Sequence, residues 1–225
     1  SGGGVYNWIP AGSLSAVDSN FTLAYPQQTT LYQVQVTDTN GCRNMAQTQV
    51  VVNPLPQPTV SPLDSICFGE STLLEATGGT AYHWSPSAGL NSTDSSAVMA
   101  SPDSTSTYIV EVFNSFGCSA LDTTGVVVMP LPVVTTSGDT NTCLSNEMQL
   151  QASGGVAYSW SPGLGLNDST ISNPIANPDS TTLYTVDVYS DFGCRSQGSV
   201  ELTVYRFRTL LDLDVGGKGP LEVAV

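Results

Sequence analysis

A period of 76 residues runs through this chain and constrains its fold more than any other feature. The sequence around each tryptophan recurs as "YNWIP", "YHWSP" and "YSWSP", which begin at Tyr6, Tyr82 and Tyr158. Without gaps, residues 66–129 match residues 142–205 at 26 of 64 positions. Similarity of a chain to itself at a fixed spacing is the signature of a repeat protein. The chain is therefore a tandem array of similar units.

Within each unit, apolar side chains alternate with polar ones. In "LYTVDVYS" (183–190), Tyr184, Val186 and Val188 share one face, and residues 107–114 and 31–38 repeat the pattern. A period of two is typical of half-buried antiparallel strands, whereas Gly-Gly, Pro-Asp-Ser and Phe-Gly-Cys sequences mark turns. No segment shows apolar periodicity over the length of a helix, so the sequence predicts an all-β chain.

The number of strands per unit favours a β-sandwich. About seven short strands, with turns every 8–12 residues and a tryptophan in an early strand, are typical of immunoglobulin-like domains. PKD-like and fibronectin-III-like sandwiches stay open as alternatives. Prolines in residues 54–58 and 130–133 predict stiff linkers. We predict a rod-like array with domains at residues 1–53, 57–129 and 133–205, followed by residues 206–225 as a linker or a strand of the next or a neighbouring domain.

Charge and hydropathy exclude several classes of partner. The chain has 19 acidic and 5 basic residues, which give a net charge of −14. Binding to nucleic acid or to an anionic membrane surface needs clustered Lys and Arg, so we expect neither. No stretch approaches 18 consecutive apolar residues, so we expect no membrane insertion. The composition favours an extracellular protein.

The first unit begins close to its tryptophan, without the strand that precedes the tryptophan in the other two units. The last residues of the chain, "GPLEVAV" (219–225), alternate like that strand, and Leu221, Val223 and Val225 are its apolar positions. One hypothesis is that this segment donates the strand to another copy or to a covalent continuation, because an incomplete sheet edge invites pairing. The alternative is an arbitrary boundary with a frayed tail.

The five cysteines also follow the repeat. Cys67 and Cys143 precede the strand before the tryptophan, whereas Cys118 and Cys194 lie between the last two strands. The economical pairs are Cys67–Cys118 and Cys143–Cys194; each would close a loop of about 52 residues and stabilise its unit by roughly 4 kcal/mol. Such pairs imply an oxidising, exported setting. Cys42 is then free, or its partner lies elsewhere, and a metal site is the weaker alternative.

Residues that could support catalysis or ligand binding have simpler explanations. His83 is the only histidine and a Ser/His/Asp triad would need it, but we interpret it as an exposed spacer that points away from the Trp84 face. The tyrosine and tryptophan stripes could stack sugars, but strand positions of period two favour a core role. The Asp residues that could bind calcium, which are Asp103, Asp179, Asp212 and Asp214, match no calcium loop and favour turns. We expect no enzyme activity, cofactor or metal.

A longer composite motif carries a family resemblance. In the third unit it comprises Cys143, Gly154, Gly155, Tyr158, Trp160, Ser161, Pro162, Gly165, Leu166, Pro178, Tyr184, Val186, Val188, Gly193 and Cys194. This pattern resembles the Ig-like repeats of giant Bacteroidota surface proteins, including gliding-motility adhesins and other type IX secretion substrates. The resemblance covers residues 1–205 and weakens at 206–225. It implies export, a filamentous surface array and a role in adhesion or motility.

The same resemblance suggests a modification. Triplets that begin with Asp and continue with Ser or Thr are similar to the O-glycan acceptor pattern of exported Bacteroidota proteins. The hydroxyl residues they would modify are Ser65, Ser104, Thr123, Ser169 and Ser180.

The sequence as a whole predicts a non-catalytic structural and adhesive segment of an extracellular bacterial surface fibre or giant adhesin. It would act by multivalent weak contacts, through self-association or tandem continuation, on a surface polysaccharide or on a host or prey cell surface. The alternative is a spacer or binding module of a secreted carbohydrate-active enzyme.

Overall fold

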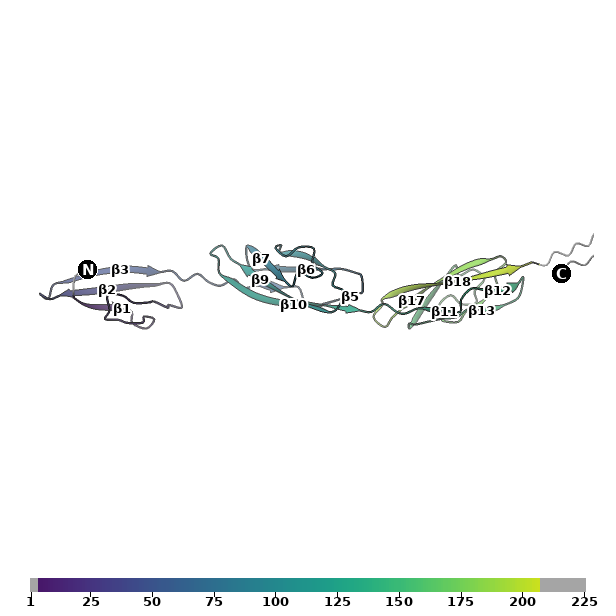
Figure 1. Ribbon diagram of the computed structural model, residues 1–225, viewed down its shortest axis with the longest axis horizontal. Helices are drawn as coiled ribbons and strands as arrows, with labels where there is room; N and C mark the ends of the chain where they lie inside the picture. Colours follow the sequence, from purple (N-terminus) through teal and green to yellow (C-terminus); the bar gives the residue numbers. More distant parts are fainter. Residues whose placement is uncertain (1–3, 207–225) are drawn as a thin grey trace, which may run out of the picture. The chain divides into compact units, whose positions relative to one another are not determined.

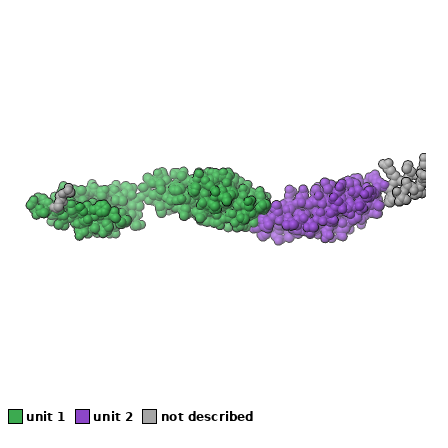
Figure 2. Space-filling view, in the orientation of Figure 1, with its two compact units in different colours: residues 1–128 green, residues 129–225 purple. Residues whose placement is uncertain are grey.

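The structure is a computed structural model that describes residues 4–206 of the 225-residue chain. These residues form strands β1 to β18 and no helix (Figure 1). The chain divides into two compact units, residues 1–128 and 129–225, which Figure 2 shows in different colours. The prediction of an all-β chain of tandem Ig-like sandwiches is confirmed.

The third repeat is a sandwich of two layers. One layer has the order β12-β18-β17-β15, with bounds Thr140–Cys143, Arg195–Tyr205, Thr182–Tyr189 and Ala157–Ser161. The other layer consists of two short pairs, β11 (Thr135–Thr136) with β14 (Ala152–Ser153) and β13 (Met148–Gln149) with β16 (Ile175–Ala176). This arrangement of a longer sheet over a shorter one is that of an immunoglobulin-like domain.

The second repeat has the same plan. Its longer sheet has the order β5-β10-β9-β7, with bounds Asp64–Cys67, Ser119–Met129, Ser106–Phe113 and Ala81–Ser85. Its shorter sheet has the order β4-β6-β8, with bounds Thr59–Val60, Thr72–Thr77 and Ala97–Ala100. Each strand of the longer sheet in the second repeat thus has a counterpart in the third.

The alternating residues of the sequence form the cores. Tyr184, Val186 and Val188 on β17 are fully buried, whereas Leu183, on the opposite face of the strand, is 57% exposed. Trp160 from β15 closes the core and donates its indole N–H to the carbonyl of Ile171 at 2.9 Å. A fixed partner for a buried indole N–H removes the cost of an unsatisfied donor, so the tryptophan can fill the centre of the sandwich.

The first repeat is a single sheet in the part of the chain that the structure describes. Its strands β1 (Gly4–Ile9), β2 (Thr30–Asp38) and β3 (Arg43–Val50) pair in the order β1-β2-β3. These correspond to β7, β9 and β10 of the second repeat. Opposite them lies only an isolated bridge, Leu14 with Ala24, and among residues 4–206 no strand pairs with the outer edge of β3.

All three repeats keep the same tryptophan contact, and the second and third also share a tyrosine contact. The indole N–H of Trp8, Trp84 and Trp160 reaches the carbonyl oxygen of the residue eleven positions later, at 2.8–2.9 Å. The hydroxyl of Tyr108 donates to Ala88 and that of Tyr184 to Leu164, while Tyr32 bonds the Ser13 hydroxyl instead. The 76-residue period is thus a period of structure as well as of sequence.

The directions of β12 and of the last strand, β18, show where the chain enters and leaves the third repeat. The strand β12, which follows the two-residue strand β11, runs parallel to β18, and Cys143 at its end lies opposite Tyr205 at the end of β18. Because β12 and β18 run the same way, the chain enters at one end of the sandwich and leaves at the other. We call these ends the entry pole and the exit pole.

Candidate functional site

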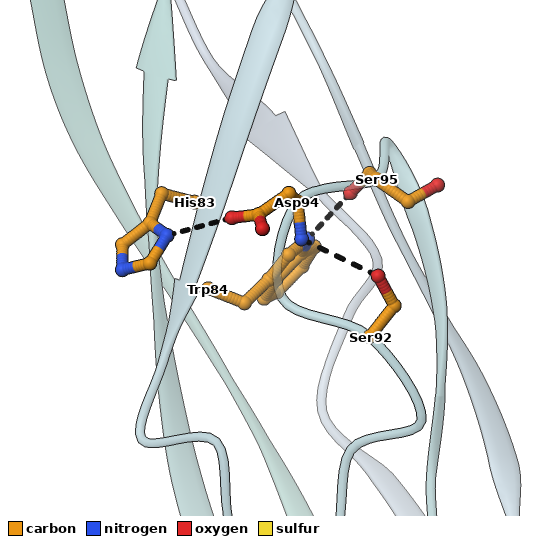
Figure 3. A network of polar contacts seen from close by, with 5 residues as sticks. All are labelled: His83, Trp84, Ser92, Asp94 and Ser95. Carbon is orange, nitrogen blue, oxygen red and sulfur yellow. Dashed lines mark hydrogen bonds and ion pairs between the residues drawn. The ribbon is translucent and has the colours of Figure 1, made fainter.

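His83 is the residue that any histidine-dependent chemistry would require. Its Nδ1 lies 2.9 Å from Oδ1 of Asp94, and the two side chains are 57% and 75% exposed. Figure 3 shows the imidazole of His83 and the indole of Trp84 on opposite sides of the strand that carries them, with the indole pointing toward Ser95. The hydrogen bond from His83 lowers the pKa of the Asp94 carboxyl below its ordinary value. The interpretation of His83 as an exposed residue pointing away from the Trp84 face is confirmed.

The pair resembles half of a catalytic triad but has no nucleophile. Within residues 4–206, the other ring nitrogen of His83 has no hydrogen-bond partner. The nearby Ser92 hydroxyl instead accepts the backbone N–H of Asp94 at 3.4 Å (Figure 3). A triad needs a serine bonded to the imidazole, held away from water. The His83–Asp94 pair is therefore a solvated surface ion pair.

In the second and third repeats the aromatic stripes lie in the cores, as the spacing predicts, whereas Trp8 of the first repeat is half-buried. Trp84 and Trp160 are 1% and 3% exposed, and Tyr108 and Tyr184 are fully buried. Burial raises the pKa of both tyrosine hydroxyls. Side chains enclosed in this way cannot stack on a sugar.

The acidic residues do not gather into a metal site in the described part of the chain. No group of three or more His, Cys, Asp or Glu residues there is placed to hold an ion. Asp103 and Asp179 are exposed turn residues, and the backbone carbonyl of Asp179 accepts a bond from Arg206 at 2.6 Å. Asp212 and Asp214 lie outside the described residues, as do Leu221, Val223 and Val225 of the predicted donor strand.

The predicted glycan acceptors lie on accessible loops and strands. Ser65, Ser104, Thr123 and Ser180 are exposed, and Ser169 is half-buried. The preceding acidic residues organise the local backbone: Asp64, Asp122 and Asp168 each accept a backbone N–H at 2.8 Å. Thr123 also lines a shallow groove with Leu63. Glycosylation stays a prediction.

The cysteines depart from the predicted pairing. Cys67 and Cys194 are disulfide-bonded, whereas Cys42, Cys118 and Cys143 are free thiols. The predicted pairs Cys67–Cys118 and Cys143–Cys194 are therefore wrong, because each contains a free thiol. That Cys42 is free agrees with one of the two alternatives left open for it.

The register of the third repeat explains why the predicted pairs cannot form. Cys194 immediately precedes β18, which is 11 residues long, and Cys143 lies opposite the last residue of that strand. At about 3.3 Å per residue the two cysteines are separated by roughly 35 Å. A disulfide requires Cα atoms about 4.4–6.8 Å apart. In the second repeat β5, which ends in Cys67, lies next to β10, which Cys118 precedes, so the same separation applies.

Tight turns hold the cysteines in place. At the β9–β10 turn, Oδ1 of Asn114 accepts the backbone N–H groups of Phe116 and Cys118, both at 3.0 Å. At the β17–β18 turn, the Ser190 hydroxyl accepts the backbone N–H of Cys194, and the Cys194 carbonyl accepts the backbone N–H of Ser190. We call Cys42, Cys118 and Cys194 the hairpin cysteines. Cys67 and Cys143, the strand-end cysteines, are fixed by turns in which Cys67 accepts from Glu70 and Cys143 from Asn146.

The Gly-Gly motif, which the sequence marked only as a turn, fastens the incoming linker at the entry pole. A Cβ on Gly154 would lie 2.0 Å from the carbonyl oxygen of Val133, and a Cβ on Gly155 would lie 2.3 Å from that of Tyr189. In the second repeat, a Cβ on Gly78 would lie 2.1 Å from the carbonyl oxygen of Gln57. The recurrence of paired glycines at the repeat spacing could have predicted this contact with the linker, because close backbone approach requires the absence of Cβ.

Comparisons with known proteins find similar solved structures but no family. No family model matches the chain, and no curated protein matches it. Among solved structures, the I-band fragment I67–I69 from titin is similar with a TM-score of 0.44 and 16% identity, covering 89% of this chain and 87% of that one. Immunoglobulin domains 1–4 of Sidekick-1 are similar with a TM-score of 0.33 and 16% identity, covering 90% of this chain and 68% of that one. The insect immune protein hemolin is similar with a TM-score of 0.36 and 11% identity, covering 90% of this chain and 68% of that one. No conclusion about function follows from these similarities.

The described part of the chain also lacks a membrane-spanning helix. Among residues 4–206, no helix is both long enough and apolar enough to cross a membrane.

Proposed function

We propose that this chain is a structural and adhesive segment of an extracellular array, part of a bacterial surface fibre or giant adhesin used in attachment or motility. One observation carries the proposal: in the third repeat β12, which follows the two-residue strand β11, runs parallel to the last strand, β18. A domain of this design receives the chain at its entry pole and passes it on at its exit pole, so that a long chain can be built by repetition.

The same strand arrangement suits a chain under tension. Force applied at the two termini of the third repeat loads the β12–β18 ladder along its length, because the strands are pulled in opposite directions. All the hydrogen bonds of this ladder must then break together, whereas the hydrogen bonds of a hairpin pulled from one end break one at a time. Thr136 adds a further tie by donating its hydroxyl to the Ser199 carbonyl at 3.1 Å.

The surface supports an extracellular location and weak, repeated contacts. The net charge of −14 with few lysines disfavours nucleic acid and anionic membranes. The disulfide-bonded state of Cys67 and Cys194 suits an oxidising compartment. Under this proposal the acceptors at Ser65, Ser104, Thr123, Ser169 and Ser180 carry glycans, and the Bacteroidota type IX secretion route accounts for export. Self-association and binding to surface polysaccharides supply adhesion through multivalency.

Force spectroscopy on the full chain tests the load-bearing role. Handles at the two termini pull the third repeat in shear, whereas handles at Ala157 and Tyr189, which pair at one end of the β15–β17 ladder, pull that end apart. We expect a markedly higher unfolding force in the first geometry. Equal forces would contradict a structural role under tension.

A binding assay separates adhesion from the alternative of an enzyme spacer. Beads coated with the chain at high density are applied to immobilised polysaccharides and to bacterial and animal cells. We expect retention that rises steeply with coating density, because weak contacts add. Tight binding of a single soluble chain to one polysaccharide would instead favour a carbohydrate-binding module of an enzyme.

A further inference from the structure

We propose that two copies of this chain associate through the outer face of the sheet in the first repeat. This face is the side of strands β1, β2 and β3 that lies opposite Trp8 and Tyr32. Five amide side chains and four large apolar side chains share it, and we call it the amide face: Asn7, Gln33, Gln35, Gln47 and Gln49, with Val5, Ile9, Leu31 and Met45. The inference names the surface for the self-association in the proposed function, and it rests on that proposal.

Strand register assembles the amide face from three neighbouring strands (Figure 1). Gln35 lies between Asn7 on β1 and Met45 on β3, and the next row repeats this arrangement. On β2 the buried Tyr32 and Val34 point to the other side of the sheet. In the second repeat the shorter sheet packs on that other side. A sandwich of this design therefore leaves the amide face open.

The chemistry of the amide face makes it complementary to a second copy of itself. Within residues 4–206 its five amide groups make no hydrogen bond, and its four apolar side chains are 48–71% exposed. An amide both donates and accepts, so it can pair with another amide, and large apolar groups free of charge are typical of interface centres. None of the residues of the amide face is aromatic, so none could stack on a sugar ring. A protein partner therefore fits this face better than a polysaccharide.

The charge of the chain is distributed unevenly among the repeats. Residues 1–53 contain two acidic residues and one basic residue, so their net charge is −1. Residues 57–129 contain seven acidic and no basic residues, and residues 133–205 contain seven acidic residues and one basic residue, which give −7 and −6. Two copies of so acidic a chain repel each other least where they meet through the first repeat.

The two carboxylates of the first repeat lie off the amide face. Asp38 accepts backbone N–H groups within the β2–β3 turn, at 2.8 and 2.9 Å. Asp18 belongs to the loop in which the Ser19 carbonyl accepts the indole N–H of Trp8, on the other side of the sheet. Arg43, the first residue of β3, is the one charged residue at the rim of the face. Because it stands at one end, two copies with antiparallel strands keep their arginines apart.

The counterparts of the amide face in the other repeats carry charge. Glu111 and Asp187 stand where the first repeat has Gln35, and Glu201 stands where it has Gln49. The fold therefore accepts a carboxylate at these positions. The neutral amide face belongs to the first repeat alone among the three.

The size of the amide face indicates a weak contact. Three strands about 4.8 Å apart, with seven residues of β2 at about 3.3 Å each, span roughly 10 Å by 20 Å. A standard interface buries about 800 Å² on each partner. A single pair of faces is therefore held only transiently, and many copies on one surface are needed for adhesion.

Clustering of beads coated with the full chain tests this surface. Gln35→Glu copies the second repeat and brings one carboxylate from each copy into the contact. We expect it to reduce clustering about tenfold or more at equal coating density, because like charges then meet at the interface. Asn20→Asp is the matched control, since it adds the same charge in an exposed position of the loop on the tryptophan side. It should cluster like the native chain.

The outcomes separate this inference from the proposed function. Equal clustering of native and Gln35→Glu beads would overturn the amide face as the contact and leave self-association standing. Native beads that fail to cluster at any coating density would overturn both the inference and the self-association. The load-bearing role is measured independently, by force spectroscopy.

NMR dilution of the full chain locates the contact without any substitution. Between about 10 μM and about 1 mM, the range of weak contacts, we expect the side-chain amide signals of Gln33, Gln35 and Gln47 to shift with concentration. The backbone signals of their counterparts on the third repeat, Thr185 and Ser199, should stay fixed. Shifts confined to the tryptophan side, or no shifts at all, would overturn the proposal. So would amide-face shifts that appear only when dextran is added to the dilute chain, which would assign the face to a neutral glycan.

Discussion

The first and third repeats carry the same motif residues but bury them to different degrees. Tyr32 and Tyr184 are 1% and 0% exposed, so this tyrosine is buried in both repeats. Trp8 is half-buried whereas Trp160 is 3% exposed, and β3 is exposed along nearly its whole length whereas β18 buries Val200 and Leu202. The first repeat therefore has the recurrent motif without the core.

The difference shows which part of the sequence specifies the sheet and which part stabilises it. The tryptophan and the alternating tyrosine and valines of the motif lie on β1 and β2, which pair with each other, and β3 pairs with β2, so these residues are sufficient to define that sheet. The core also needs the opposite sheet, to which Leu74 and Ala76 contribute in the second repeat and Leu150 and Ala152 in the third. Burying such side chains supplies most of the free energy of folding.

The largest effect should come from completing the first repeat. A copy of residues 57–76 placed directly before Ser1 supplies counterparts of β4, β5 and most of β6 at the repeat spacing. Ile66, Leu74 and Ala76 of the copy would cover β2 and β3, and we expect the free energy of unfolding of this repeat to rise by about 4 kcal/mol. Hydrogen exchange of the β3 amides should slow in parallel. A copy carrying Leu74→Asp serves as the control and should give little protection; equal protection from both copies would contradict this account.

A pair of matched truncations measures the same difference inside the cores. Val188 is fully buried and its counterpart Val36 is only half-buried. We expect Val188→Ala to lower the free energy of unfolding of the third repeat by about 2 kcal/mol, because it leaves a cavity. Val36→Ala should cost the first repeat less than half as much. Urea unfolding followed by hydrogen exchange within each repeat gives both values, and similar losses would mean that the first repeat has a complete core.

The sequence predicted the repeats, the strands and the exposure of His83 because each depends on local pattern. Alternation along "LYTVDVYS" sets the faces of β17, and the 76-residue spacing sets the equivalence of the tryptophans. The cysteine pairing depends on a non-local fact, the parallel register of β12 and β18. Economy in loop length favoured pairs within a repeat, but the register places Cys143 opposite Tyr205 and far from Cys194.

The tyrosine hydroxyl anchor should have a smaller effect that depends on pH. Tyr184→Phe removes the 3.1 Å bond to the Leu164 carbonyl and should cost the third repeat about 1 kcal/mol at neutral pH. Burial raises the pKa of Tyr184 in the folded state, so above the ordinary value near 10 the unfolded chain loses its proton first. Stability should therefore fall as the pH rises through the alkaline range.

Tyr184→Phe should weaken the loss of stability at alkaline pH in the third repeat. The loss in the second repeat should stay unchanged, because burial also raises the pKa of Tyr108 there. Melting curves from about pH 8 to about pH 11, with hydrogen exchange assigning each transition, bracket the ordinary tyrosine pKa and check the expectation. An unchanged alkaline slope in the third repeat would show that Tyr184 does not titrate with unfolding.

The smallest effect belongs to the surface ion pair, which only the second repeat has. Asn7 and Ser159 stand where the second repeat has His83, so the pair is not part of the shared fold. Because both side chains are solvated, His83→Ser, which copies the third repeat, should leave the melting temperature unchanged. It should nevertheless raise the pKa of Asp94 toward its ordinary value, since the bond from His83 is the main cause of the lowering. NMR titration of the Asp94 carboxyl through the acidic range measures the change. A clear loss of stability together with an unshifted pKa would mean that His83 acts through packing, and the contrast between shared core and variable surface would no longer hold at this position.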